Sequence, residues 1–155
     1  MERRKFFKNI LVAGGTLALM PSFSFAADKP RRGEFAMSMS DAQKAITSGK
    51  KAVSSDKVKL TVPNIAENGK VVPVKVFIDH PMEEGNYISS INVLTSKNGN
   101  SRCARVFLNP MNGEAYFSTR IKLGGTQDVV AIAETNKGEY LMSAKPVKVT
   151  IGGCG

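Results

Sequence analysis

Short runs of β-branched and other apolar residues, separated by turn residues, fill the chain from residue 58 to residue 151. Apolar and polar positions alternate within the runs, so that Val72, Val74 and Val76 share one side, as in strands that bury one face. Glycine-containing pairs such as Asn68-Gly69 separate the runs and favour hairpins. The pattern predicts an all-β, antiparallel sandwich of the immunoglobulin type. Its seven strands are expected at Val58–Ile65, Val71–Asp79, Tyr87–Ser96, Ser101–Asn109, Glu114–Leu123, Thr126–Thr135 and Glu139–Ile151.

The polar segment 27–57 contains one helical signal. Ser40 is a candidate N-cap, Asp41 suits the first turn, and Gln43 stands at the capping-box position. Gly49 follows as a stop signal. The segment is therefore expected to form a short helix from about Asp41 to Ser48.

Residues 1–26 have the organisation of an export signal. A basic head is followed by the apolar run Ile10–Met20, and Ser24-Phe25-Ala26 supplies small residues at a cleavage spacing. The run is about half of the roughly 20 residues that span a bilayer, so a removed signal is favoured over an anchor. Arg3 and Arg4 suggest the twin-arginine route, which exports folded proteins, although an ordinary secretory signal is the alternative. We expect cleavage after Ala26 and a periplasmic protein.

Charge favours small anionic ligands. The chain has 22 Lys and Arg against 13 Asp and Glu, a net charge of +9, and 18 basic and 12 acidic residues remain without the signal. The lysines are spread along the chain and do not interleave with aromatic residues, which argues against a nucleic-acid surface. A chain of 155 residues has room for one domain of ordinary size.

The candidate chemistry lies at the end of the chain. Every residue after Ile151 is glycine except Cys154, since Gly152, Gly153 and Gly155 complete the sequence. Glycine has no side chain to pack, so residues 152–155 are expected to form a flexible arm that carries the thiol. Three extended peptide steps give it a reach of about 10 Å. Such an arm suits delivery into another protein's active site, because a nucleophile that acts on its own must be held beside a base.

Other chemistries have weak support in the sequence, and no catalytic residue, cofactor or metal is expected. His80 is the only histidine, and two distant cysteines with it make no zinc pattern. Met37 and Met39 are an M-x-M pair of the kind that can bind copper, but incidental methionines explain them better.

A disulfide between Cys103 and Cys154 is an alternative in an oxidising compartment. Alternation places Cys103 on one face with Arg105 and Phe107, away from Ala104. A disulfide would fix the arm to the sandwich, so the flexibility that its glycines provide would have no use. Two other functions remain open: an immunoglobulin-like adaptor stabilised by this disulfide, and a thiol enzyme such as a reductase.

The chain resembles SoxY, the carrier subunit of the periplasmic Sox sulfur-oxidising system. The resemblance is carried by the C-terminal segment Val147–Gly155, by Ile65–Gly69 leading to Val72-Pro73-Val74, and by Thr119-Arg120-Ile121 with Thr126-Gln127. The family tail commonly ends Gly-Gly-Cys-Gly-Gly, whereas this chain stops one glycine earlier. Cys103 is not part of the motif.

The resemblance implies a covalent carrier and no enzyme activity of its own. A c-type haem enzyme, SoxXA, would couple thiosulfate oxidatively to Cys154, and the hydrolase SoxB would release sulfate. The sulfane dehydrogenase SoxCD would oxidise the remaining sulfur in some organisms. The resemblance also implies a stable heterodimer with SoxZ, exported as a folded pair.

The export signal yields the first prediction. We expect N-terminal sequencing of the periplasmic protein to begin at Ala27, because the cleavage spacing lies at Ser24 and Ala26. Replacing Arg3 and Arg4 together by Lys should block export by the twin-arginine route. Undiminished export of that double variant would contradict the twin-arginine assignment.

Overall fold

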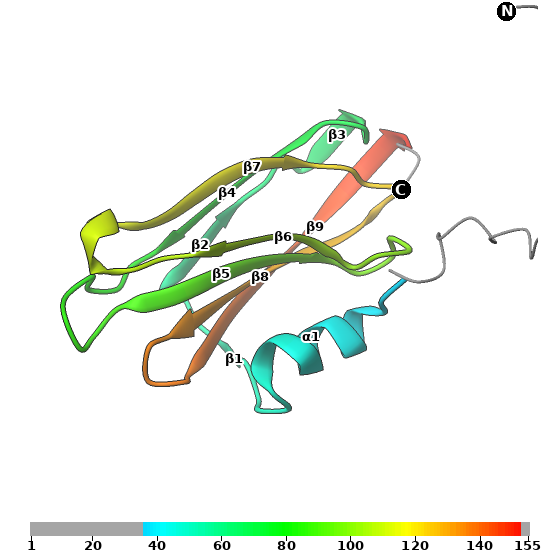
Figure 1. Cartoon of the computed structure of the whole chain (residues 1–155). Helices are drawn as coiled ribbons and strands as arrows, with labels where there is room; N and C mark the ends of the chain where they lie inside the picture. The colour runs from blue at the N-terminus through cyan, green and yellow to red at the C-terminus, as the bar shows by residue number, and fades with distance from the viewer. Residues whose placement is uncertain (1–35, 153–155) are drawn as a thin grey trace, which may run out of the picture. The chain divides into compact units, whose positions relative to one another are not determined.

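The computed structural model describes residues 36–152 (Figure 1). The expected export signal, most of the segment before the helix, and the arm residues Gly153, Cys154 and Gly155 lie outside the described residues. The elements of the described part are α1 (Met39–Thr47), β1 (Val53–Ser54), β2 (Val58–Thr61), β3 (Ile65–Asn68), β4 (Val72–Ile78), β5 (Ile88–Thr95), β6 (Arg102–Phe107), the 3-10 helix η2 (Pro110–Asn112), β7 (Ala115–Ile121), β8 (Gln127–Thr135) and β9 (Tyr140–Ile151).

The strands form two sheets that enclose the main core, so the predicted immunoglobulin-like β-sandwich is confirmed. The large sheet has the order β1-β9-β8-β5-β6, with β3 also paired to β9, and the small sheet has the order β2-β4-β7. Alternation along β4 buries Val72, Val74 and Val76 completely and exposes Lys75 between them. Such burial stabilises the fold by about 25 cal/mol per Å² of apolar surface removed from water.

The first predicted strand is two strands in different sheets. β2 pairs antiparallel with β4, whereas β3 pairs parallel with β9. Pro63 lies between them and has no N–H to offer a ladder, so the chain leaves the small sheet there. β1 also pairs parallel with β9, and the sandwich is therefore not purely antiparallel.

The predicted helix is present but begins two residues earlier, at Met39. Ser38, and not Ser40, is the N-cap, and its Oγ accepts a hydrogen bond from the backbone N–H of Asp41 at 3.2 Å. Met39 and Met37 pack on a second core cluster between α1 and the large sheet, which favours the earlier start and gives both methionines a packing role. In the described part of the chain, no helix is long and apolar enough to cross a membrane.

The junction after β7 yields a stability prediction. Leu123 is fully buried in the core, whereas its neighbour Lys122 is exposed. Leu123→Ala should lower the free energy of unfolding by about 2–5 kcal/mol, because a lost buried side chain leaves a cavity. Urea titration measures this difference. The control Lys122→Ala should change it by less than about 0.5 kcal/mol, and equal losses would contradict the placement of these side chains.

Candidate functional site

The last strand is held by hydrogen bonds as far as Ile151, the residue before the arm. β3 pairs with β9 up to the register Asn68↔Ile151, and Figure 1 shows β3 beside the end of β9. The backbone N–H of Gly69 donates to the carbonyl of Ile151 at 2.8 Å, and that of Leu123 donates to the carbonyl of Gly69 at 2.7 Å. We call the group Gly69, Leu123, Gly124, Ile151 and Gly152 the arm base. The arm therefore leaves the sandwich from a fixed point.

Gly152 lies so close to Gly124 that no other residue type fits there. A Cβ added to Gly152 would lie 2.5 Å from the carbonyl oxygen of Gly124, a backbone atom that cannot move aside cheaply. The sequence suggested flexibility as the reason for glycine here, and it gave no sign of this close approach. Flexibility of the arm through Gly152, Gly153 and Gly155 stays a prediction.

Two side-chain amides tie the neighbouring loops to the arm base. Asn98, in the β5–β6 loop, donates from Nδ2 to the carbonyl of Lys122 at 2.7 Å and accepts at Oδ1 from the N–H of Gly124 at 3.1 Å. Gln127 is 4% exposed; its Nε2 donates to Asn98 Oδ1 at 2.8 Å, and its Oε1 accepts from the N–H of Lys97 at 2.8 Å. Sequence reasoning assigned neither residue a role, although the segment Thr126-Gln127 was among those that carried the family resemblance.

Cys103 points between the sheets, and the face predicted for it is wrong. The β5–β6 register passes from Val93↔Ala104 to Leu94↔Arg102, so Cys103 is the extra residue of a β-bulge. The bulge shifts the alternation by one residue and turns Cys103 toward the main core, on the same side as Ala104. A bulge cannot be read from alternation, since it depends on the partner strand.

The environment of Cys103 keeps its thiol protonated. Burial raises the pKa of Cys103 above its usual value, and hydrogen bonding with Thr95 and Asn98 opposes this shift only in part. The Thr95 Oγ1 to Cys103 Sγ distance is 3.4 Å. Since the thiolate is the reactive form, Cys103 is a weak nucleophile.

A hollow between the edges of the two sheets adjoins the arm base. It has a volume of about 270 Å³ and is lined by Asn98, Asn100, Cys103, Arg120, Ile121 and Lys122. Two of these residues are cations and none is acidic. His80 lies elsewhere, after the far end of β4, where its Nδ1 is 2.8 Å from the carbonyl of Pro81.

The fold and the arm base define an immunoglobulin-like domain whose last strand is followed in the sequence by glycines and Cys154. Among residues 36–152, no three His, Cys, Asp or Glu side chains gather where they could hold a metal ion. The sequence model described as "Sulfur oxidation protein SoxY" matches residues 43–154. The chain therefore belongs to the SoxY family, as the resemblance indicated.

Two solved structures are similar to this chain, and the first agrees with this assignment. The sulfur carrier protein SoxY from Chlorobium limicola f thiosulfatophilum is 27% identical, with a TM-score of 0.60 over 74% of this chain and 100% of that one. A superoxide reductase (neelaredoxin) from Ignicoccus hospitalis is 22% identical, with a TM-score of 0.55 over 76% and 97% of the two chains. At that identity the second match shows a shared fold alone. No curated protein sequence matches this chain.

The close approach at the arm base yields a third prediction. Gly152→Ala should push the end of β9 away from Gly124, because a Cβ has no space there. We expect hydrogen exchange at the amide of Gly69, which is bonded to Ile151, to become about tenfold faster, which corresponds to about 1.4 kcal/mol. The control Gly125→Ala meets nothing within 4 Å and should leave that amide unchanged. Equal exchange in both variants would contradict the contact.

Proposed function

We propose that this protein carries intermediates of sulfur oxidation covalently on Cys154 and presents them to separate Sox enzymes. The observation that carries the proposal is the arm base, where Ile151 is hydrogen-bonded and Gly152 is already exposed. The family match, which runs to residue 154 and so includes the cysteine, supports it.

The covalent distance from the arm base suits delivery. Cys154 lies two peptide steps beyond Gly152, so the two Cα atoms are at most about 7 Å apart. A partner's active site can therefore receive the thiol through a narrow opening while the sandwich stays outside. Small glycines on both sides of the cysteine keep the arm thin enough for such an opening.

The proposed chemistry balances when the partner supplies the oxidant. Thiosulfate and the Cys154 thiol give a cysteine S-thiosulfonate, one proton and two electrons, and the electrons pass to the haem of SoxXA. Water then cleaves the terminal S–S bond in SoxB, releasing sulfate and a proton and leaving a cysteine persulfide. A thiol is mostly protonated at pH 7 unless its surroundings favour the thiolate, so we expect the partner site to activate Cys154.

Positive charge beside the arm base supports an anionic cargo. Lys97 and Lys122 stand on the two loops joined by Asn98, and Arg120 lines the same hollow as Lys122. The S-thiosulfonate carries a negative charge and is attracted to these cations, an effect that salt screens at exposed sites. The cations also favour the approach of thiosulfate itself.

The heterodimer with SoxZ fits the surface at the other end of β6. Phe107 is 69% exposed and Met111 is 95% exposed, and β6 is an edge strand with unpaired backbone groups. Exposed apolar side chains beside a free edge favour pairing with another chain. A partner there leaves the arm base uncovered. Export of the folded pair to the periplasm by the twin-arginine route belongs to the same proposal.

A Cys103–Cys154 disulfide, on which the adaptor alternative depends, has less support. The Cys103 thiol is half-buried and hydrogen-bonded to the hydroxyl of Thr95. Its raised pKa lowers the fraction of thiolate, which makes Cys103 a poor partner for thiol–disulfide exchange.

The decisive variant is Cys154→Ser. It should abolish thiosulfate-dependent oxygen uptake by the reconstituted enzymes, because the only loading site is lost, while the fold and the association with SoxZ stay intact. Intact mass spectrometry of wild-type protein from thiosulfate-grown cells should show sulfur adducts that the variant lacks.

Cys103→Ser is the matched control. We expect it to retain most of the activity and all of the adducts, since Cys103 lies in the sandwich and not on the arm. Full activity of Cys154→Ser, or equal damage from Cys103→Ser, would refute the carrier mechanism in favour of a structural disulfide.

A further inference from the structure

The outer face of the small sheet carries positive charge without negative charge. Alternation and register place on it Lys59, Lys75, Phe77, Tyr116, Ser118 and Arg120, which we call the basic face. No residue of β2, β4 or β7 is Asp or Glu. Asp79 and Glu114 are the nearest acidic residues along the chain, and both lie beyond the strand ends furthest from the arm base. An uncovered sheet face of a single sign attracts an oppositely charged surface.

The large sheet has a different outer face. Glu134 lies there with Arg105, at 3.9 Å between the carboxylate and the guanidinium, and α1 covers the neighbouring region. Arg102 lies on the same face, opposite Leu94, but Glu134 offsets part of the positive charge there, whereas the strands of the small sheet contain no acidic residue.

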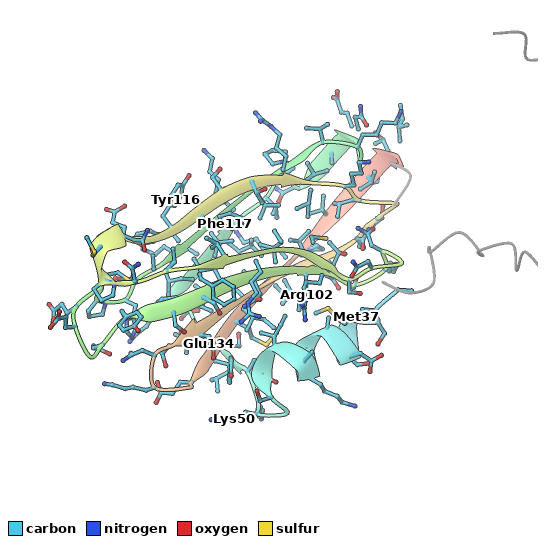
Figure 2. The ribbon with its side chains drawn as sticks, viewed as in Figure 1. Met37, Lys50, Arg102, Tyr116, Phe117 and Glu134 are labelled. Atoms are coloured by element: carbon cyan, nitrogen blue, oxygen red, sulfur yellow. The ribbon has the colours of Figure 1, made fainter. Side chains whose placement is uncertain are left out.

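Aromatic side chains are set among the cations of the basic face. Phe77 and Tyr116 stand directly opposite each other on β4 and β7, and Lys59 Nζ lies 5.5 Å from the centre of the Phe77 ring. Tyr116 is 47% exposed, whereas the adjacent Phe117 packs on the core (Figure 2). Aromatic residues and arginine are enriched at protein interfaces, so this composition suits contact with a protein.

The basic face is indented at its centre. One hollow of about 480 Å³ is lined by Pro73, Lys75, Ser118, Thr119 and Arg120, and a second of about 230 Å³ shares Pro73 and Lys75. Side chains of a partner can enter these hollows and contact Lys75 from both sides.

The basic face reaches the arm base. Arg120 pairs with Pro73 near the end of β7, and four residues along the chain from Arg120 lies Gly124, which touches Gly152. That stretch spans at most about 14 Å. A protein that holds Arg120 and Lys75 therefore stands beside the point where the arm leaves.

We propose that the basic face docks an acidic protein surface next to the active-site opening of each enzyme that receives the arm. This inference rests on the proposed carrier function. A face dominated by cations suits transient binding, which charge steers, whereas permanent interfaces are more apolar. The exposed aromatic ring and the hollows favour a protein over an anionic membrane surface.

Charge reversal tests the docking. The protein in complex with SoxZ is assayed for loading by SoxXA and for sulfate release by SoxB, with the carrier as the varied substrate. The double variant Lys75→Glu, Arg120→Glu should lower kcat/KM with both enzymes at least about tenfold at low salt, with kcat at saturation little changed. Raising the salt should shrink this difference, since screening weakens charge attraction.

Two further variants isolate the face. Lys75 lies outside the hollow that contains Cys103, whereas Arg120 lines it. If the loss of kcat/KM in the double variant comes from weaker docking, and not from weaker anion binding in that hollow, Lys75→Glu alone should also lower kcat/KM severalfold. Lys137→Glu, in the exposed β8–β9 turn, makes the same change of charge elsewhere and should stay within twofold of wild type.

Three outcomes would overturn the proposal. The first is an unchanged kcat/KM in the double variant while Cys154→Ser is inactive, which leaves the carrier function standing without this docking face. The second is an equal loss in Lys137→Glu. In the third, the wild type binds phosphatidylglycerol vesicles, the double variant does not, and the two have the same enzyme kinetics. That result would assign the basic face to a membrane.

Discussion

The parallel pairing of β3 with the end of β9 is the interaction on which the carrier architecture depends. β8 pairs with β9 from Tyr140 to Val147 on one side, and β3 covers Lys148 to Ile151 on the other. Without β3, the last residues of β9 would have unpaired backbone groups and would fray. With it, β9 is paired as far as Ile151, and the next residue, Gly152, is exposed. A thiol on a short arm is delivered to a defined place only when the other end of the arm is fixed.

The two cysteines differ in the residues that surround them. The bulge in β6 places Cys103 between the sheets, where burial favours the protonated thiol. Cys154 has only glycines beside it, so nothing in its local sequence can bury or shield it. Because thiolate character controls reactivity, the buried Cys103 is the less reactive thiol, which is consistent with the proposal that sulfur is carried on Cys154.

The surface is divided in a way that fits a carrier with several partners. The large sheet has α1 and the Glu134–Arg105 pair on its outer face, and exposed Phe107 at the far end of its edge strand. The small sheet presents cations and aromatic rings beside the arm base. Apolar and charged contacts suit lasting and short-lived association respectively. This division is consistent with the proposal that the domain keeps one permanent partner and binds its enzymes in turn.

The sequence by itself determined the sandwich class, the inward faces of strands such as β4, and the position of the candidate thiol, because two-residue alternation and glycine-rich turns are local signals. It missed the features that depend on distant segments. The bulge at Cys103 follows from register with β5, and the break at Pro63 sends β3 to a strand some 80 residues later in the chain.

The arm base also depends on residues that are distant in the sequence. Asn98 and Gly124 have the sequence context of ordinary turn residues. Only in the folded chain does Asn98 accept a hydrogen bond from the N–H of Gly124, and only there does Gly152 lie against the carbonyl oxygen of Gly124. The helix begins at Met39, with Ser38 and not Ser40 as its N-cap, because Met39 packs on the large sheet, a contact that no helical signal encodes. The local sequence identified the candidate thiol, and tertiary contacts decided where the strand before it ends.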